Sequence, residues 1–429
     1  MKLWKQRNQS TNKIIEQFTV GNDRVLDLEI ARYDIQASKA HAQMLNKVKL
    51  LSDEEFRAIA NELEKLQIAA EDGTFTIEEE FEDVHSKIEY ELTQALGDTG
   101  KKIHAGRSRN DQVLVCLHLY VKDQIWEIKR LTKELFQQLQ QLSEQHKEVL
   151  MPGYTHMQVA MPSSFGLWFG AYAESLVDDL HPLNAAFRMA DQNPLGSAAG
   201  YGSSLPLDRK MTTELLGFGT LKYNSVAAQM SRGRLEQSTS IALSSLAGTL
   251  SKLAMDVCLF CNQNYDFISF PDRLTTGSSI MPHKKNPDVF ELIRAKCNDL
   301  QSLPNELAMI TNNLPSGYHR DYQLLKEKLF PAVEKLKSCL KVTQLMLQHI
   351  EINTDILEGE KYRYLFSVEE VNKQVKRGVP FRDAYRNIGK AIKNELFNPE
   401  STVTHSHEGS IGNLCNNEIR GKFESVFNN

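Results

Sequence analysis

A seven-residue polar segment in the first third of the chain could bind an anion. Residues 106–112 read GRSRNDQ and place Arg107 and Arg109 beside Ser108 and Asn110. The arginines supply positive charge, and the serine and asparagine supply directed hydrogen bonds. The same composition also fits a solvated helix start that Ser108 or Asn110 caps, so both interpretations stand.

A histidine lies beside two polar side chains in residues 152–158, which read PGYTHMQ. The Pro-Gly pair predicts a turn that presents Thr155, His156 and Gln158 together. An isolated histidine is more often structural, but an imidazole held in position can transfer protons near neutral pH. The segment is therefore a candidate for general acid–base chemistry.

The third segment has the composition of a mobile loop with a fixed far end. Residues 275–287 read TTGSSIMPHKKNP, and a helix that carries Glu291 follows. Lys284 and Asn286 could approach an anion next to hydroxyl groups such as that of Ser278. This pattern is typical of an active-site lid, although an ordinary connector has a similar composition.

The fourth segment, residues 315–321 (PSGYHRD), leads into a helix. Tyr318, Gln323 and Lys326 could bind a polar ligand there. The charged residues that open the helix could equally face solvent.

Neither metal-binding nor cofactor-binding motifs accompany these segments. Cys258 and Cys261 form a CxxC on an apolar helix face, without a second pair or a nearby histidine, whereas structural zinc sites use four ligands. His405, His407 and Glu408 read as a polar tail for the same reason. We therefore expect an enzyme without metal or cofactor.

Long amphipathic helices must position the four segments. Apolar residues recur every three or four positions over 121–142, 243–261 and 333–350, without internal proline. Helices of this length bury their apolar stripes by lying side by side as a bundle. Shorter helices are predicted elsewhere, with caps at Ser52 with Glu55, Thr76 with Glu79, and Ser367 with Glu370.

We predict an all-α fold of three helical domains, because strand patterns are scarce. They comprise residues 1–105, a central long-helix bundle at 106–345, and a small C-terminal domain at 346–429. A helix from Ser367 ends near Gly378 and another starts at Phe381. The last 30 residues are rich in His, Ser, Gly and Asn and are predicted to be irregular.

Composition narrows the class of protein. The net charge is −5 and no long basic cluster occurs, which argues against a nucleic-acid partner. No stretch approaches the roughly 20 apolar residues of a membrane span. Met1–Thr11 is polar and shows no apolar signal core. Six scattered cysteines indicate reduced thiols, so we expect a cytoplasmic protein. Because no apolar span occurs, we expect no membrane partner.

Together, the four segments resemble the signature of the fumarase/aspartase superfamily. Its most diagnostic loop, GSSxMPxKxNP, is matched at Gly277–Pro287. Within the superfamily, GRSRNDQ, the GYTHxQ at 153–158 and the KKNPD that ends at Asp288 resemble argininosuccinate lyases. The resemblance extends from about Asp34 to Phe381 and implies a fumarase/aspartase-like fold.

The resemblance also implies an activity and an assembly. The small-molecule substrate would be argininosuccinate, cleaved reversibly to arginine and fumarate by anti elimination in arginine biosynthesis, without a cofactor. The protein would be a homotetramer with a central bundle of long helices from four chains. Each active site would be shared among three chains.

Matching positions imply the site residues. His156 and Ser278 would be the proton-transfer pair, with Glu291 orienting His156. The others would contact the substrate: Ser108, Arg109, Asn110, Thr155, Lys284 and Asn286 around the succinate part, Tyr318, Gln323 and Lys326 around the arginine part, and Gln158 and His85 as further binding residues.

The implied chemistry explains these residue types. Removing a proton from the carbon next to a carboxylate builds up a doubly negative aci-carboxylate, which preorganised donors must stabilise. Serine is a poor base unless activated, here by backbone N–H groups of the Gly277 loop and by Lys284 once the lid excludes water. Either His156 or Ser278 could be the base, with the other as acid.

Two segments depart from the family pattern. Ser231–Arg234 reads SRGR where relatives usually carry Arg-Asp-Phe after the serine, and the glycine-rich Gly196–Ser204 also differs. Both bear on contacts to the amine-bearing half of the substrate. The alternatives are another fumarate-releasing lyase, such as an adenylosuccinate lyase, or a non-catalytic crystallin-like structural protein.

Overall fold

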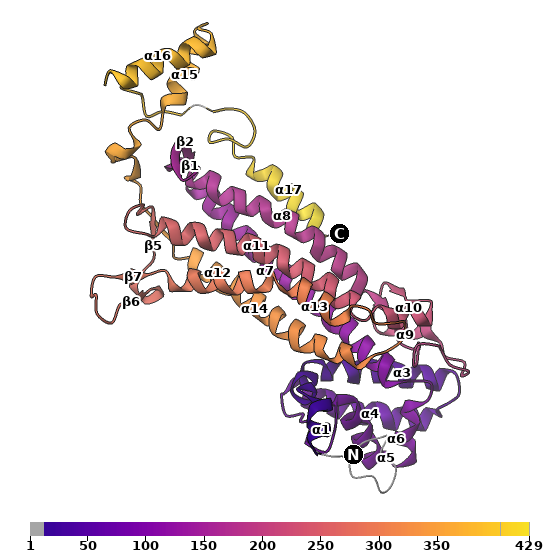
Figure 1. The fold of residues 1–429 in the computed structure, drawn as a ribbon. Coiled ribbons are helices and arrows are strands. Elements are labelled where there is room, and N and C mark those ends of the chain that lie inside the picture. Colours follow the sequence, from indigo (N-terminus) through magenta and orange to yellow (C-terminus); the bar gives the residue numbers. More distant parts are fainter. Residues whose placement is uncertain (1–12, 404, 429) are drawn as a thin grey trace. The chain divides into compact units, whose positions relative to one another are not determined.

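Long helices dominate the computed structural model, which describes residues 13–403 and 405–428 (Figure 1). Within these residues the strands are short, at most seven residues, and form four two-stranded sheets. The predicted all-α fold is confirmed. The first twelve residues, where the sequence shows no signal core, lie outside the described part of the chain.

The chain folds as two compact units. Unit 1 comprises residues 1–128, 182–245 and 299–335, and unit 2 comprises residues 129–181, 246–298 and 336–429. The three domains expected from the sequence follow a different division, which stays a prediction.

Four long helices contribute residues to both units. They are α7 (Arg109–Gln145), α8 (Phe165–Ala190), α11 (Arg234–Phe260) and α14 (Leu324–Leu347). The apolar stripes predicted for three of them are buried, as at Leu135, Leu139, Leu246, Leu250 and Leu336. Burial of these stripes supplies the core that holds the polar segments in place.

Polar contacts fix these helices to one another within each unit. In unit 1, Nδ1 of the buried His118 on α7 lies 2.8 Å from the carbonyl oxygen of Ala190 on α8. In unit 2, Trp168 and Tyr172 on α8 donate hydrogen bonds of 3.0 and 2.6 Å to Asp256 on α11.

Shorter helices complete unit 1: α1 (Lys13–Val20), α2 (Asp23–Leu26), α3 (Ala31–Lys47), α4 (Asp53–Glu71), α5 (Val84–Leu96), α6 (Asp98–Lys101), α9 (Arg209–Leu215), α10 (Ser225–Met230) and α13 (Leu303–Thr311). The capping box of Ser52 and Glu55 before α4 is confirmed. The cap at Thr76 is wrong, because its hydroxyl bonds Glu78 in an irregular segment and α5 begins after Asp83.

Two antiparallel hairpins in unit 2 carry predicted site residues. Strands β1 (Leu150–Thr155) and β2 (Gln158–Ser164) form the first, and β6 (Thr276–Gly277) and β7 (Lys285–Asn286) form the second. Helix α12 (Asp288–Leu300) follows the second hairpin. The remaining pairs are β3 (Gln192–Asn193) with β4 (Thr220–Leu221), and β5 (Ile268–Ser269) with β8 (Glu351–Ile352).

The C-terminal region of unit 2 partly follows prediction. Helices α15 (Ser367–Lys376) and α16 (Phe381–Lys393) are present, but Ser367 makes no side-chain cap. The irregular ending is wrong, because α17 (Asn416–Phe427) is a helix. Its Phe423 stacks on Phe136 of α7 with ring centroids 3.9 Å apart, and this contact with an earlier helix stabilises α17.

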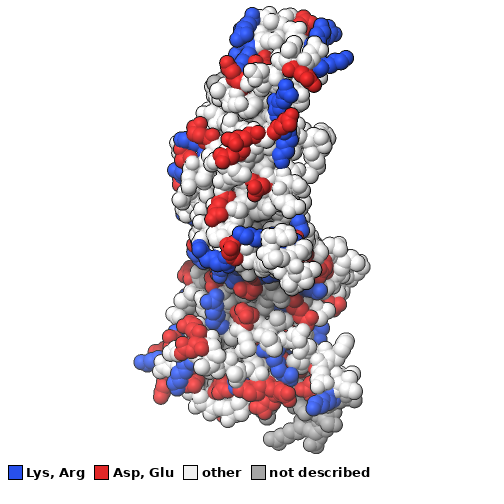
Figure 2. Space-filling model, turned by 90° about the vertical axis from the view of Figure 1, so that its left-hand side faces the viewer, with Lys and Arg blue, Asp and Glu red and all other residues white. Residues whose placement is uncertain are grey.

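Surface charge and hydropathy bear on possible partners. On the face drawn in Figure 2, Lys and Arg side chains are interspersed with Asp and Glu. The stretch Ser225–Phe260 is long and apolar enough to cross a membrane by length and composition alone. A buried bundle helix meets the same criteria, so this is weak evidence for a span. The expected absence of nucleic-acid and membrane partners stays a prediction.

Candidate active site

Six of the predicted binding residues line one pocket of about 230 Å³ in unit 1. They come from α5, the start of α7, the segment that leads into α14 and the first turn of α14, and they are His85, Arg109, Asn110, Tyr318, Gln323 and Lys326. Asp23, Asp27, Asp83, Val113, Arg232 and Arg320 complete the wall. The pocket therefore presents both positive and negative groups to a ligand.

Ser108 caps the helix that brings Arg109 and Asn110 to this pocket. The backbone N–H of Asn110 donates to Ser108 Oγ at 3.3 Å, and the N–H of Ser108 donates to Asp111 Oδ1 at 2.8 Å. The capping interpretation is thus confirmed. Ser108 itself is not among the pocket-lining residues, and its role in binding stays a prediction.

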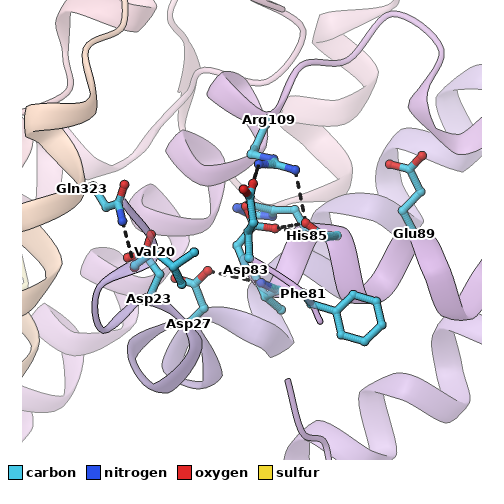
Figure 3. Close-up of polar contacts among 12 residues, drawn as sticks. Val20, Asp23, Asp27, Phe81, Asp83, His85, Glu89, Arg109 and Gln323 are labelled. Atoms are coloured by element: carbon cyan, nitrogen blue, oxygen red, sulfur yellow. Dashed lines mark hydrogen bonds and ion pairs between the residues drawn. The ribbon is translucent and has the colours of Figure 1, made fainter. Parts of the chain in front are cut away.

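Two carboxylates hold Arg109 next to the N-terminus of α5 (Figure 3). Its guanidinium lies 2.9 Å from Glu82 and 3.2 Å from Asp83, and it donates to the hydroxyl of Ser86 at 3.2 Å. Asp83 also caps α5 through the N–H of Ser86. Arg109 is thereby fixed in place but remains partly accessible from the pocket.

His85 lines the pocket and is largely buried against Asp34. Its Nδ1 lies 2.8 Å from Asp34 Oδ2, while Nε2 has no hydrogen-bond partner among the described residues. Burial opposes the charged imidazolium, but Asp34, Asp83 and Asp27 outweigh it and raise the pKa of His85. Burial likewise opposes the Asp34 carboxylate, and His85 and Arg107 outweigh it and lower the pKa of Asp34. His85 can therefore offer a charged N–H to an anion.

The raised pKa makes the stability contributed by His85 depend on pH. This contribution is complete below the ordinary pKa of 6.5 and is lost as pH rises through the folded-state value. We expect His85→Gln to cost roughly 3–5 kcal/mol of unfolding free energy near pH 6, because the buried Asp34 loses the imidazolium that pairs with it, and less in alkaline solution. Denaturant unfolding across this range measures the difference, and a pH-independent loss would contradict the prediction.

Lys326 and Gln323 contact the first helices of the chain. Lys326 Nζ lies 2.5 Å from Asp27 and 2.8 Å from Asp23, and it is 4% exposed. Burial opposes the ammonium, but the two carboxylates raise the pKa of Lys326. Burial raises the pKa of Asp23 to about 6. Gln323 donates to the carbonyl oxygen of Val20 at 3.0 Å (Figure 3).

Sequence reasoning missed the acidic groups around this pocket. Asp23, Asp27, Asp34 and Asp83 were not among the predicted site residues, yet they set the protonation of His85 and Lys326. No sequence motif marks them, because the burial of Asp27 (1% exposed) and Asp34 (0% exposed) is visible only in the structure. Acidic residues at such positions require a charged or hydrogen-bonding partner.

A possible ligand set for a metal includes the pocket residue His85. Ligand atoms of Asp34, His85 and Cys116 all lie within 4.8 Å of one another. Burial raises the pKa of the Cys116 thiol well above its ordinary value, which disfavours the thiolate that a metal needs. Asp34 and His85 are already paired, so these residues fit a metal poorly.

His156 lies at the tip of the β1–β2 hairpin in unit 2. Thr155 pairs with Gln158, so His156 and Met157 form a two-residue turn, with φ of 53° and 60°. Positive φ at both positions defines a type I′ turn, which usually requires Asn or Gly. The turn predicted at Pro-Gly is wrong, because Gly153 lies at an irregularity in β1 and the chain reverses three residues later.

Ser278 begins the loop between β6 and β7. Its Oγ accepts hydrogen bonds from the backbone N–H groups of Ile280 at 3.3 Å and Met281 at 3.1 Å. The two ends of this loop, which was predicted to be a mobile lid, are joined by the pairing of two residues of β6 with two residues of β7. Lys284 is exposed near the end of this loop, and Asn286 is on β7.

Glu291 stands on α12 and is exposed, as is His156. Among the described residues of this single chain, no hydrogen bond or ion pair joins Glu291, Ser278 and His156 to one another. The roles assigned to all three stay predictions.

A protein family and individual argininosuccinate lyases are similar in sequence to this chain. The family described as lyase matches residues 5–301. Argininosuccinate lyase from Bacteroides fragilis is 58% identical over 418 residues, covering 97% of this chain and 93% of that protein. Argininosuccinate lyase from Thermotoga neapolitana is 39% identical over 394 residues, covering 92% and 99%.

Two solved structures show the same fold. An EDDS lyase in complex with formate has a TM-score of 0.76 and 22% identity, covering 90% of this chain and 78% of that chain. A class II fumarase from Schistosoma mansoni has a TM-score of 0.72 and 17% identity, covering 89% and 91%. The fumarase/aspartase-like fold expected from the motifs is confirmed.

Proposed function

Because this chain belongs to the lyase family and, within it, to the argininosuccinate lyases, we propose that it cleaves argininosuccinate reversibly to arginine and fumarate. Near-full-length identity to curated argininosuccinate lyases is the observation that carries the proposal. The unit 1 pocket supports it, because argininosuccinate carries carboxylates, an ammonium and a guanidinium. Cations such as Arg109 and Lys326 and carboxylates such as Asp23 and Asp83 complement these groups.

The elimination requires a base and an acid on opposite faces of the substrate. The base removes a proton from the carbon next to a succinate carboxylate, and the C–N bond then breaks as the acid protonates the departing guanidinium nitrogen. Two backbone N–H groups already donate to Ser278 Oγ and would favour negative charge there. This contact supports Ser278 as the base and His156 as the acid.

We further propose a cytoplasmic homotetramer with shared active sites, acting in arginine biosynthesis. Apolar side chains exposed on α11, α12 and α14 support association, among them Ile241 at 50%, Leu292 at 59% and Leu345 at 47% exposure. A shared site would bring Glu291 of one chain to His156 of another. Sedimentation equilibrium of the purified protein tests the tetramer.

Incubation of the purified protein with argininosuccinate tests the activity. We expect equal amounts of fumarate and arginine. The absorbance of its double bond measures fumarate, and mass spectrometry measures arginine. Adenylosuccinate is the matched comparison, and faster fumarate release from it would favour an adenylosuccinate lyase. A folded tetramer that releases fumarate from neither substrate would favour a structural protein.

A further inference from the structure

The glycine-rich loop Gly196–Ser204 is held in a strained conformation in unit 1. Ala198 has φ of 54°, in the left-handed region that residues with a Cβ rarely adopt. Gly200 has φ of 111°, and a Cβ on it would lie 2.8 Å from a side-chain carbon of Gln229. Such conformations persist where the surrounding structure fixes them, and they are frequent at functional sites.

Asp111 fixes this loop to the start of α7. Its Oδ2 accepts hydrogen bonds of 2.9 Å from the backbone N–H groups of both Gly196 and Ala198. Its Oδ1 accepts from the N–H of Ser108, and the carboxylate is fully buried. One buried group thus joins the loop to the helix end that carries Asn110, a pocket residue.

The tip of the loop lies beside Gly317, the residue that precedes the pocket residue Tyr318. Tyr201 is 74% exposed, and its hydroxyl oxygen lies 3.7 Å from the position that a Cβ on Gly317 would take. Tyr318, the next residue, lines the pocket. The loop therefore places an exposed aromatic ring next to the segment expected to hold the arginine part.

We propose that Tyr201 is a further binding residue for the guanidinium-bearing half of the substrate, and that Asp111 is the positioning residue that holds its loop. The proposal rests on the proposed function. An aromatic ring attracts a guanidinium through its negative face, and this attraction is present equally before and during the reaction. Tyr201 should therefore affect binding more than the chemical step.

Kinetics of fumarate release test Tyr201. We expect Tyr201→Ala to raise KM for argininosuccinate roughly three- to tenfold with nearly unchanged kcat, and Tyr201→Phe to retain the wild-type KM, since phenylalanine keeps the ring. Tyr223→Ala is the matched control, because Tyr223 is 73% exposed in the same unit. A KM for Tyr201→Ala equal to that of the control would overturn the proposal.

Calorimetric titration of the same four proteins with arginine separates this proposal from the proposed function. If the wild type releases no fumarate, the proposed function fails, and weaker arginine binding by Tyr201→Ala alone would still support Tyr201. Equal arginine affinity in all four proteins, or binding by none, would overturn it.

A double-mutant cycle tests the positioning role of Asp111. In the wild type, the two carboxylate oxygens of Asp111 accept hydrogen bonds from the N–H groups of Ser108, Gly196 and Ala198. Asp111→Asn leaves one acceptor oxygen for these groups, so either the loop or Ser108 loses a partner. We expect Asp111→Asn to raise KM, and the double variant with Tyr201→Ala to raise it by less than the product of the single effects. Simple multiplication of the two effects would overturn the link between Asp111 and Tyr201.

Discussion

Replacement of Ser278 by alanine is expected to lower kcat for argininosuccinate cleavage by a factor of roughly 10²–10⁴, the usual contribution of a positioned proton-transfer group. The variant loses the oxygen to which Ile280 and Met281 donate, so no alkoxide can form there. KM should change less, because the hydroxyl acts on the transferred proton. Initial rates of fumarate formation give both constants.

The neighbouring serine provides the matched control. Ser279 is exposed in the same loop and accepts no comparable hydrogen bonds among the described residues, so Ser279→Ala should retain most of the wild-type kcat. Sedimentation must show the same assembly for both variants. Near-normal turnover by a correctly assembled Ser278→Ala protein would refute the assignment of Ser278.

The second large effect is expected at the buried ion pairs of Lys326. Lys326→Met leaves Asp27 without its ion-pair partner at a position that is 1% exposed. Breaking a buried pair from one side costs roughly 3–5 kcal/mol of unfolding free energy, because the remaining charge stays desolvated. Denaturant unfolding of the wild type and the variant at neutral pH measures this loss.

Lys328, two residues later on α14, gives a direct comparison. Its ammonium lies 2.9 Å from Glu306, but these side chains are 47% and 39% exposed. Exposed pairs contribute about 0–1 kcal/mol, so Lys328→Met should be nearly neutral. Equal losses of stability in the two variants would show that burial does not determine the contribution of Lys326.

The long helices could be predicted from the sequence because their signal is local. Leu243, Leu246 and Leu250 repeat at helical spacing, and the residues that bury them need not be known. The last helix was missed although Ile419 and Phe423 have the same spacing. Its stripe is short and lies in a polar region, and the ring of Phe136 that stabilises it is distant in the sequence.

The pocket was predicted in part for the same reason. Motifs identified Arg109, Asn110 and Lys326 as a set, but the pairing of Lys326 with Asp27 joins residues 299 positions apart. No local pattern specifies such a contact. The partner of a buried charge becomes visible only when the tertiary structure brings the two segments together.

The hairpin turn was placed wrongly because two rules conflicted. Pro-Gly usually marks a reversal, yet a Cβ on Gly153 would lie 2.9 Å from the carbonyl oxygen of Met161 across the hairpin. Glycine is needed there for close approach of the strands. The reversal instead falls on His156 and Met157, at positions where local preference alone would favour Asn or Gly.

That reversal determines when the entropy of ordering His156 is lost. A two-residue connection between paired strands leaves its backbone a single narrow conformation. The peptide is therefore immobilised when the chain folds, before any substrate arrives. In the proposed reaction, substrate binding then has to restrict only the side-chain torsions of His156. The entropic part of the activation barrier is smaller for that reason.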